Sequence, residues 1–382
     1  MSDKASCRIL PVRSRRDLTT FIRLPGRLYA GHPGFTPALE IERRETLHRG
    51  KNPYFQHAEA ELFLAWRGDR AVGRISAQID RLALERERDA TGHFGFLDAI
   101  DDPEVFALLC GAAEEWLASR AMRRALGPLS FSTNEECGLM VEGFDERPML
   151  MMSYHPPYAA ARLVEQGYVK CKDLIAYDYD VFDAPPFKPP KVIERALAGG
   201  RLKLRPLDMK RYDDDIRAAL EIYLDAWSEN WGHVPPTHAE TDHAVKTMKP
   251  LVRPELVWLA ELDGKASGMI VCLPNLAEAA AGLNGRLLPF GWARLLWRLK
   301  VSGVRSSRVM LFGVLRRYQG TALGAAMSLM LLQQLRSHGR ELRIGHAELS
   351  WVLEDNVAMR RLAESIGSRA YKLYRIYEKA LA

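Results

Sequence analysis

A proline-rich segment near the middle of the chain divides it into two parts of similar length. Ala184-Pro185-Pro186-Phe187-Lys188-Pro189-Pro190 contains four prolines in six residues. Proline lacks a backbone N–H and fixes its own φ, so this segment continues neither a helix nor a central strand and predicts a stiff linker. We therefore expect one domain at 1–183, a linker at 184–190 and a second domain at 191–382. A chain of 382 residues is long enough for two domains.

The two parts share an order of features, beginning with a hairpin. In the first part, apolar runs at 59–66 and 71–75 flank a polar turn, and in the second part runs at 256–262 and 267–271 flank Asp263-Gly264-Lys265. Asp-Gly between apolar runs is a strong hairpin signal. The glycines after the two turns, Gly73 and Gly268, lie 195 residues apart.

Each part also closes in the same way. A helical pattern ends at Gly167 in the first part and at Gly367 in the second, and tyrosine-rich strand patterns follow both. These two glycines lie 200 residues apart. The similar spacing at two separate landmarks favours a divergent tandem repeat, so that one fold is used twice.

Within the second part, strand patterns at 201–206, 308–315 and 346–352 alternate with helical patterns at 213–227, 320–337 and 356–366. The first part has a strand pattern at 94–100 and a helical pattern at 103–120. Strands that alternate with helices and are entered through a hairpin predict a mixed α/β sheet in each domain.

Charge and cysteine content exclude several classes of function. The net charge of +6 is weak for this length, and we find no basic run interleaved with aromatics, so nucleic acid is not an expected partner. The five cysteines form no CxxC pair, and no acidic cluster suggests a metal. No signal peptide and no membrane-spanning run is visible. We expect a cytoplasmic protein with free thiols, either soluble or peripheral to the inner membrane.

The candidate for chemistry is the turn after the buried strand 308–315. Leu315-Arg316-Arg317-Tyr318-Gln319-Gly320-Thr321-Ala322-Leu323-Gly324 runs from that strand into a long helix. Glycine lets the backbone approach a ligand, and the first N–H groups of a helix have no partners within it. Such a turn is suited to a pyrophosphate. It has neither the Gly-Lys-Ser/Thr of a Walker loop nor the Gly-x-Gly-x-x-Gly of a dinucleotide fold.

Here the sequence resembles the GNAT acyltransferases, because Arg317-x-x-Gly320-x-Ala322 fits their coenzyme A loop and about 201–382 follows their order of elements. The resemblance implies a fold of two tandem GNAT-like mixed-sheet domains, the first degenerate, and coenzyme A or acyl-CoA as co-substrate without a metal. It places the pyrophosphate on the loop amides and the thioester carbonyl at a backbone N–H of the preceding strand. The implied coenzyme-binding residues are Phe312, Gly313, Val314, Arg317, Tyr318, Gln319, Gly320, Thr321, Ala322, Leu323 and Asn356.

An attacking amine must lose a proton, so the reaction needs a base. Strand alternation places His346, Glu348 and Ser350 on one face, and Glu348 is the candidate base, directly or through a water. The alternative is that these are solvated polar residues. Asn356 would contact the coenzyme by analogy or simply cap its helix.

The family's usual proton donor is missing from its expected place. A tyrosine often follows the asparagine by seven residues in this family, and here that position is Ala363. Tyr374 is the candidate replacement, beside Tyr371 and Tyr377, although aromatic strand residues often serve only packing.

The first domain has no phosphate loop. Asp101-Asp102-Pro103 stands at the corresponding place, and two carboxylates would repel a pyrophosphate. We therefore expect the coenzyme in the second domain only.

The region after the first helix of the second domain is where this fold frames its acceptor, which nominates Asn230, Trp231, Gly232 and nearby Glu240 for substrate binding. Bulky apolar residues and Arg/Lys in 285–300 predict either an interfacial helix or an ordinary core helix. The stretch 149–158 is rich in methionine and predicts a core strand, or a wall for a flexible apolar ligand.

Together these features resemble the large tandem GNAT proteins of bacteria, which include the bacterial ceramide synthases. The resemblance implies acyl transfer to a primary amine, in particular a long-chain lipid-like amine such as a sphingoid base, with peripheral contact to an anionic membrane. Two alternatives stay open at this point: acetyl transfer to a small amine, amino acid or peptide, and a non-catalytic acyl-CoA-binding protein.

Overall fold

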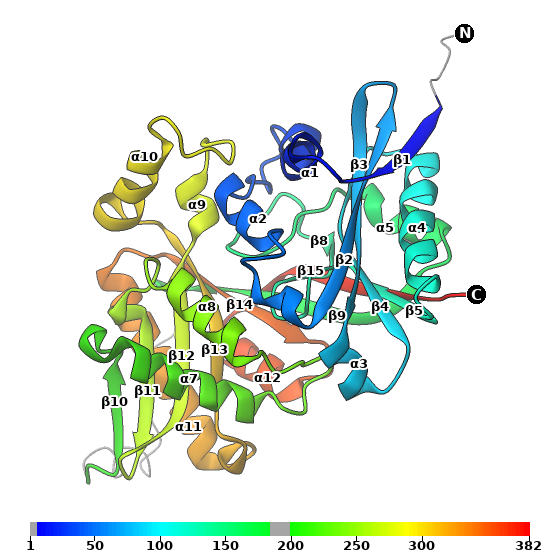
Figure 1. Ribbon diagram of the computed structural model, residues 1–382. Coiled ribbons are helices and arrows are strands. Elements are labelled where there is room, and N and C mark those ends of the chain that lie inside the picture. The colour runs from blue at the N-terminus through cyan, green and yellow to red at the C-terminus, as the bar shows by residue number, and fades with distance from the viewer. Residues whose placement is uncertain (1–5, 184–198) are drawn as a thin grey trace. The chain divides into compact units, whose positions relative to one another are not determined.

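The computed structural model describes residues 6–183 and 199–382 (Figure 1), so the predicted linker 184–190 lies outside the described residues. The chain forms two compact units. The first unit comprises 1–175, 280–291 and 371–382, and the second comprises 176–279 and 292–370. Residues 371–382 therefore belong to the first unit, although in the sequence they directly follow residues of the second unit.

The first unit is built on a mixed sheet whose strands follow the order β1-β2-β3-β4-β5-β15, with β8 also paired to β15. The pairs are antiparallel except for β4 with β5, which is parallel. The strands of this unit are β1 (Cys7–Pro11), β2 (Ala58–Arg67), β3 (Arg70–Asp80), β4 (Thr91–Ala99), β5 (Arg124–Gly127), β8 (Leu139–Glu142) and β15 (Arg369–Ala380), with a small separate pair β6 (Leu129–Ser130) and β7 (Glu136–Cys137).

Helices cover both faces of this sheet. Phe21 and Leu24 of α1 pack in one apolar cluster with β2 and β4, whereas Val105 and Leu109 of α4 pack in another with β2, β3 and β4. The helices of this unit are α1 (Arg15–Leu28), α2 (Glu40–Thr46), η1 (Pro53–Gln56), α3 (Arg81–Glu87), α4 (Pro103–Ala118) and α5 (Tyr158–Glu165).

The second unit repeats this plan. Its strands follow the order β14-β13-β12-β11-β10, antiparallel except for the parallel pair β13–β14. These strands are β10 (Leu202–Pro206), β11 (Val257–Leu262), β12 (Lys265–Pro274), β13 (Ser306–Val314) and β14 (His346–Leu353), and β9 (Val169–Asp180) runs from the first unit into the second. The helices are η2 (Met209–Arg211), α7 (Tyr212–Ala226), α8 (His238–Met248), η3 (Pro254–Leu256), α9 (Leu276–Ala280), α10 (Gly291–Trp297), η4 (Arg298–Ser302), η5 (Arg316–Tyr318), α11 (Ala322–Glu341) and α12 (Val357–Ser365).

The repeated glycines have a packing reason. A Cβ on Gly73 would lie 2.7 Å from a methyl carbon of Leu109, on α4. A Cβ on Gly268 would lie 3.1 Å from a methyl carbon of Val314 and 3.4 Å from one of Leu331, on α11. In both units a leucine of the helix therefore contacts the second strand of the hairpin, and the helix requires the glycine only at Gly73.

The predicted elements are confirmed with shifts of a few residues at their ends. Both hairpins, the strand and helix of the first part and the alternating elements of the second are present. The prediction of a core strand at 149–158 is wrong: residues 149–157 form turns and coil, although Met149 and Leu150 are buried, and α5 begins at Tyr158. Apolar residues bury equally well in a loop, so burial alone does not define a strand.

Candidate active site

The parallel ladder between β13 and β14 is short. It pairs Ser306 with His346 and ends where Val309 pairs with Leu349, although β13 continues to Val314 and β14 to Leu353. On its other side β13 stays paired to β12 as far as Val314. In an antiparallel pair only alternate residues bond to the partner strand, so the other N–H and C=O groups of 310–314 point toward β14. Within the described residues these groups have no strand partner, and Phe312, Gly313 and Val314 lie in this stretch.

Helix α7 lies close to this stretch of β13. A Cβ on Gly313 would lie 3.3 Å from the Cβ of Ala226, the last residue of α7. Because Gly313 and Val314 point to opposite faces, α7 and α11 cover opposite sides of the strand.

The loop after β13 presents backbone donors to solvent. Gly320 has φ +70°, which favours glycine, and the Thr321 hydroxyl accepts the Gly324 N–H at 3.0 Å as the N-cap of α11. The amides of Tyr318, Gln319 and Thr321 already donate within the loop. Between 318 and 323, the other amides have no hydrogen-bond partner among the described residues: those of Gly320, Ala322 and Leu323.

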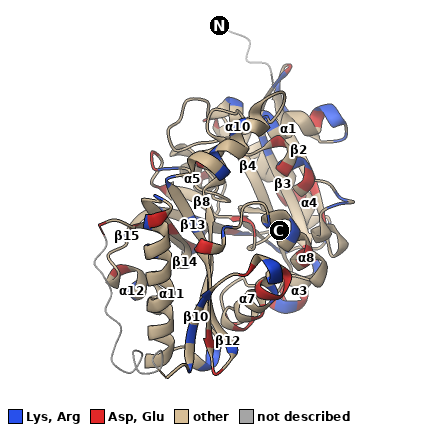
Figure 2. Ribbon diagram, turned by 90° about the vertical axis from the view of Figure 1, so that its left-hand side faces the viewer, with Lys and Arg blue, Asp and Glu red and all other residues tan. Residues whose placement is uncertain are grey.

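The helix behind this loop adds only its dipole to the site. α11 carries no charged side chain before Arg336, and its ribbon is uncoloured along most of its length (Figure 2). Gly324 is required for this close approach, because a Cβ there would lie 2.0 Å from the carbonyl oxygen of Tyr318. The loop therefore has the free N–H groups and the narrow backbone that an anionic ligand needs.

Side chains on and beside the loop divide into anchors and a cation that has no ion-pair partner within 6–183 and 199–382. The Arg316 amide donates to Asp225 at 2.6 Å, and its guanidinium pairs with Glu229. Gln319 donates to the carbonyl oxygen of Ala226 at 3.1 Å. These contacts fasten the loop to the end of α7. The exposed Arg317 guanidinium instead lies over the Tyr318 ring, 4.9 Å from its centroid.

Glu348 lies at the end of the short ladder, paired in register with Arg308. Both side chains are fully buried, with 0% and 2% exposure, and Arg308 Nε lies 3.7 Å from Glu348 Oε1. The Ser350 hydroxyl donates to Glu348 Oε1 at 2.6 Å and accepts from Arg308 Nε at 2.9 Å. Glu348 is thus not a solvated surface carboxylate. The sequence alone did not predict that Arg308 lies beside Glu348. Only the register of β13 against β14 places the two residues together, and the sequence does not report that register.

His346 does not join this cluster. Its Nδ1 lies 3.1 Å from a carboxylate oxygen of Asp178. Asn356 is the N-cap of α12 and accepts the Met359 N–H at 3.1 Å, so the capping alternative is confirmed. Ala363 is fully buried on α12, at a place where a larger side chain would have to displace its neighbours.

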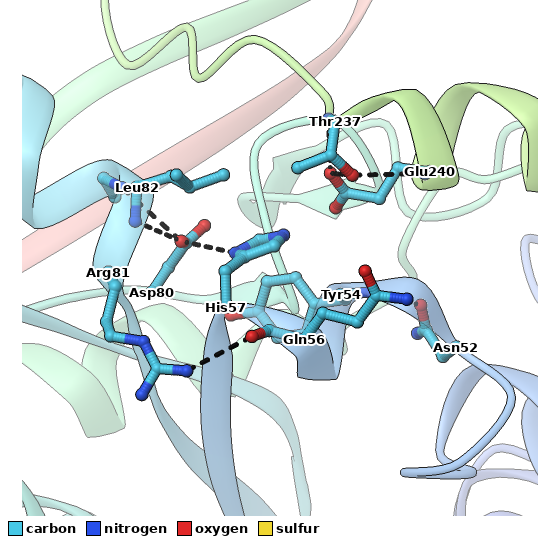
Figure 3. A network of polar contacts seen from close by, with 10 residues as sticks. Asn52, Tyr54, Gln56, His57, Asp80, Arg81, Leu82, Thr237 and Glu240 are labelled. Carbon is cyan, nitrogen blue, oxygen red and sulfur yellow. Dashed lines mark hydrogen bonds and ion pairs between the residues drawn. The ribbon is translucent and has the colours of Figure 1, made fainter.

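The predicted acceptor wall lies in a turn after α7. Asn230 donates its amide to the Trp227 carbonyl at 2.9 Å, and Gly232 has φ +65°. Glu240 forms a capping box with Thr237 at the start of α8: its carboxylate accepts the Thr237 N–H at 2.7 Å and hydroxyl at 2.9 Å (Figure 3). This capping role is one that a Thr-x-x-Glu pattern indicates by itself.

Tyr374 belongs to the first unit. It is fully buried on β15, where it pairs in register with Met140 of β8. Gly138 lies against it, since a Cβ there would lie 2.9 Å from the Tyr374 Cβ.

The first unit also carries contacts that the sequence did not predict. His57 Nδ1 lies 2.9 Å from Asp80 Oδ1, and Asp80 caps α3 by accepting the Leu82 N–H at 2.9 Å (Figure 3). At the start of α4, Asp102 accepts the Glu104 N–H and pairs with Arg67, both at 2.9 Å. A carboxylate therefore already occupies the helix N-terminus that corresponds to the phosphate loop.

No group of three or more His, Cys, Asp or Glu residues that could hold a metal ion occurs within 6–183 and 199–382. Over the same residues no helix has both the length and the apolar character needed to span a bilayer.

The chain is similar in sequence to two proteins over almost its whole length. The chain is 47% identical over 381 residues to the bacterial ceramide synthase of Caulobacter vibrioides, covering 100% of this chain and 99% of that protein. It is 42% identical over 371 residues to Protein YghO of Escherichia coli strain K12, covering 96% of this chain and 94% of that protein. No protein-family model matches the chain.

Solved structures show the fold. A tandem GNAT protein from the clavulanic acid biosynthesis pathway superposes with a TM-score of 0.58 at 14% identity, covering 99% of both chains. A GCN5-related N-acetyltransferase from Sphaerobacter thermophilus superposes with a TM-score of 0.53 at 16% identity, covering 98% of this chain and 96% of that chain. The expected tandem GNAT fold is confirmed.

Proposed function

The chain belongs to the family of the bacterial ceramide synthases, and from this premise we propose that it transfers a long-chain acyl group from coenzyme A to the amino group of a lipid-like long-chain amine. Its class of enzyme, an acyl-CoA-dependent N-acyltransferase, follows from that family and from the GNAT fold. The identity that extends over the whole length of the ceramide synthase carries the proposal for the acceptor.

We propose that coenzyme A binds at the loop between β13 and α11. We propose that its pyrophosphate accepts from the amides of Gly320, Ala322 and Leu323, with Arg317 as the neighbouring cation. Tyr318, Gln319 and Thr321 hold the loop in shape. The acyl-CoA supplies the reactive thioester, whose carbonyl would accept an N–H from the unpaired edge formed by Phe312, Gly313 and Val314. Asn356 would reach the coenzyme with its side-chain N–H₂, because its carbonyl is used in capping.

Glu348 is the proposed base. The amine nitrogen attacks the thioester carbon, the C–N bond forms, the C–S bond breaks, and the proton from nitrogen must be taken up. Glu348 lies where the β13–β14 ladder ends, beside the edge assigned to the thioester. Because its carboxylate is fully buried, we propose that it acts through water rather than by direct contact with the amine.

Tyr374 is the proposed proton donor to the leaving thiolate. Tyr374→Phe removes only the hydroxyl, and Tyr371→Phe is the matched control on the same strand. We expect Tyr374→Phe alone to lower kcat, because the leaving thiolate then departs without a proton donor. Equal kcat values for the two variants would remove Tyr374 from the mechanism.

The acceptor is proposed to lie along the turn after α7, with Asn230, Trp231 and Gly232 as its wall and Glu240 near the amine. Glu240 holds the start of α8 in place through Thr237, so it would position that wall. A long-chain amine resides in a bilayer, and we therefore propose a cytoplasmic protein that contacts the inner membrane peripherally.

The experiment that tests the function measures thiol release by the purified full chain. We expect release from long-chain acyl-CoA only when a long-chain 2-amino alcohol is present, together with the amide product by mass spectrometry. Gly320→Asp places a carboxylate in the phosphate loop and is expected to abolish both signals. Preference for acetyl-CoA and a small amine would overturn the lipid assignment, and tight coenzyme binding without turnover on any amine would overturn the enzymatic one.

Glu348→Gln separates catalysis from packing. If Glu348 is the base, turnover at the pH optimum falls by about two orders of magnitude or more while coenzyme affinity is kept. Ser350→Ala, which removes the hydroxyl bonded to the same carboxylate, is the matched control and is expected to retain most turnover. Unchanged turnover in Glu348→Gln would exclude the residue as base.

A further inference from the structure

Helix α10 and the η4 turn that follows it expose an unusual number of large apolar side chains. Leu295 and Leu299, which belong to the second unit, are buried, at 8% exposure each. The other large apolar residues of this segment face solvent: Trp292 at 51%, Leu296 at 49%, Trp297 at 56% and Val301 at 72%. The sequence predicted either an interfacial helix or a core helix in 285–300, and the structure shows a segment with one buried side and one exposed side.

The residues just before α10 are also apolar and exposed. Leu288 and Phe290 have 82% and 78% exposure and belong to the first unit. Apart from these segments, the exposed large apolar residues of the described chain are scattered singly along the sequence. Scattered residues of this kind are ordinary on a soluble protein, whereas a run of them marks an interaction surface.

The stretch of sequence that contains this segment carries charged side chains of one sign. No aspartate or glutamate occurs between Glu278 and Glu341 in the sequence. Arg294 is exposed on α10, and exposed Lys300 donates to the carbonyl of Pro250 at 3.0 Å, a contact that leaves its charge unneutralised. Glu278, the preceding carboxylate, is bonded by the amides of Arg305 and Ser306.

We propose that the exposed side of α10 and η4, formed by Trp292, Leu296, Trp297 and Val301 with Arg294 and Lys300, docks on the surface of an anionic phospholipid bilayer. Tryptophan and leucine enter the boundary between head groups and acyl chains, while Arg and Lys keep their charges among the lipid phosphates. Both the apolar area and the cations are needed for this partner. A protein partner would satisfy the apolar side chains equally well, but the absence of acidic residues over this stretch of sequence is complementary to a surface of negative charge.

This inference rests on the proposed function for its purpose, since a bilayer is where a long-chain amine is found, but its observations are independent of catalysis. The test therefore measures binding without any substrate. The full chain is sedimented with vesicles of phosphatidylcholine alone, and with vesicles of phosphatidylcholine and phosphatidylglycerol in equal parts. We expect clear partition to the anionic vesicles, weak partition to the neutral ones, and loss of binding as salt is raised.

Two variants and two matched controls locate the surface. Trp292→Ser with Trp297→Ser is expected to weaken the partition to anionic vesicles roughly tenfold or more. Arg294→Gln is expected to weaken it roughly fivefold. Met209→Ser and Arg217→Gln change an exposed apolar residue and an exposed cation elsewhere in the second unit, and neither is expected to change the partition.

Thermal unfolding is measured on the same preparations. The tryptophan variant is expected to keep the midpoint of the wild type, which shows that it is folded. Equal partition of wild type and the tryptophan variant would overturn the proposed surface. A dimer in solution that the tryptophan variant loses, without vesicle binding by the wild type, would also overturn it and assign the face to a second copy. Vesicle binding without turnover would leave this inference standing and overturn only the proposed function.

Discussion

Two buried histidines in the first unit make the stability of this protein depend on pH. His155 is 5% exposed and its Nδ1 accepts the Met140 N–H at 3.2 Å, an arrangement that requires a ring nitrogen without a proton. His93 is 6% exposed, on β4. Burial lowers the pKa of His155 to about 4 and that of His93 to about 4, against nearby carboxylates that act in the opposite direction.

The sign follows from proton binding. In the unfolded chain these histidines take up a proton below about pH 6.5, whereas in the folded chain they do so only near pH 4. The unfolded state therefore gains stability relative to the folded state as the pH falls. From about pH 7 to about pH 5 the free energy of unfolding falls by about 2 kcal/mol for each histidine. The two together remove about 4 kcal/mol, a large fraction of the stability of an ordinary domain.

The assay is urea unfolding of the full chain, followed by tryptophan fluorescence at both pH values. His155→Gln removes the titrating ring and keeps an acceptor for the Met140 N–H. We expect this variant to lose about 2 kcal/mol less than wild type between the two pH values. His238→Gln, a change of an exposed histidine on α8, is the control. If His155→Gln and wild type lost the same free energy, the histidine would not be the source of the acid lability.

Three further predictions concern packing and charge. Gly324→Ala is expected to weaken coenzyme A binding roughly tenfold or more, measured by calorimetry, because the added carbon collides with a loop carbonyl. Gly111→Ala is the control: a Cβ there meets nothing within 4 Å, so the affinity for coenzyme A is expected to stay unchanged. Arg308→Met is expected to cost about 3–5 kcal/mol in urea unfolding, since it leaves the Glu348 carboxylate buried without its guanidinium, and Arg308→Met with Glu348→Leu is expected to recover most of it. Asp102→Ala is expected to cost about 1 kcal/mol through loss of the α4 cap and Asp102→Asn clearly less, so equal thermal shifts for the two would contradict a capping role.

Much of the fold was predictable because its signals are local. The Asp263-Gly264 turn, Gly320 before the N-cap Thr321 and the helix ends at Gly167 and Gly367 depend on backbone conformations that a few neighbouring residues impose. The same signals occur twice, and the strands that they specify follow the same order in the two units, with β4–β5 and β13–β14 as the corresponding parallel pairs. The loop proposed for the coenzyme was found for the same local reason.

What lies around the site depended on contacts between residues far apart in sequence. The pairing of Glu348 with Arg308 requires the register of two parallel strands joined by a long helix, and no spacing in the sequence reports that register. The wrong strand at 149–158 has a related cause, since apolar composition indicates burial without specifying backbone geometry.

The sequence by itself determined the repeat, the strand-to-helix loop and the side chains that the loop offers, because turns, caps and glycine positions act over a few residues. Only the tertiary structure decided which members of each pattern are buried. It placed Leu295 and Leu299 inside and Trp292 and Leu296 in solvent, and it enclosed Glu348 beside Arg308. Burial is a property of the neighbours that the whole chain brings to a residue, and for that reason a stripe of similar side chains can be half core and half surface.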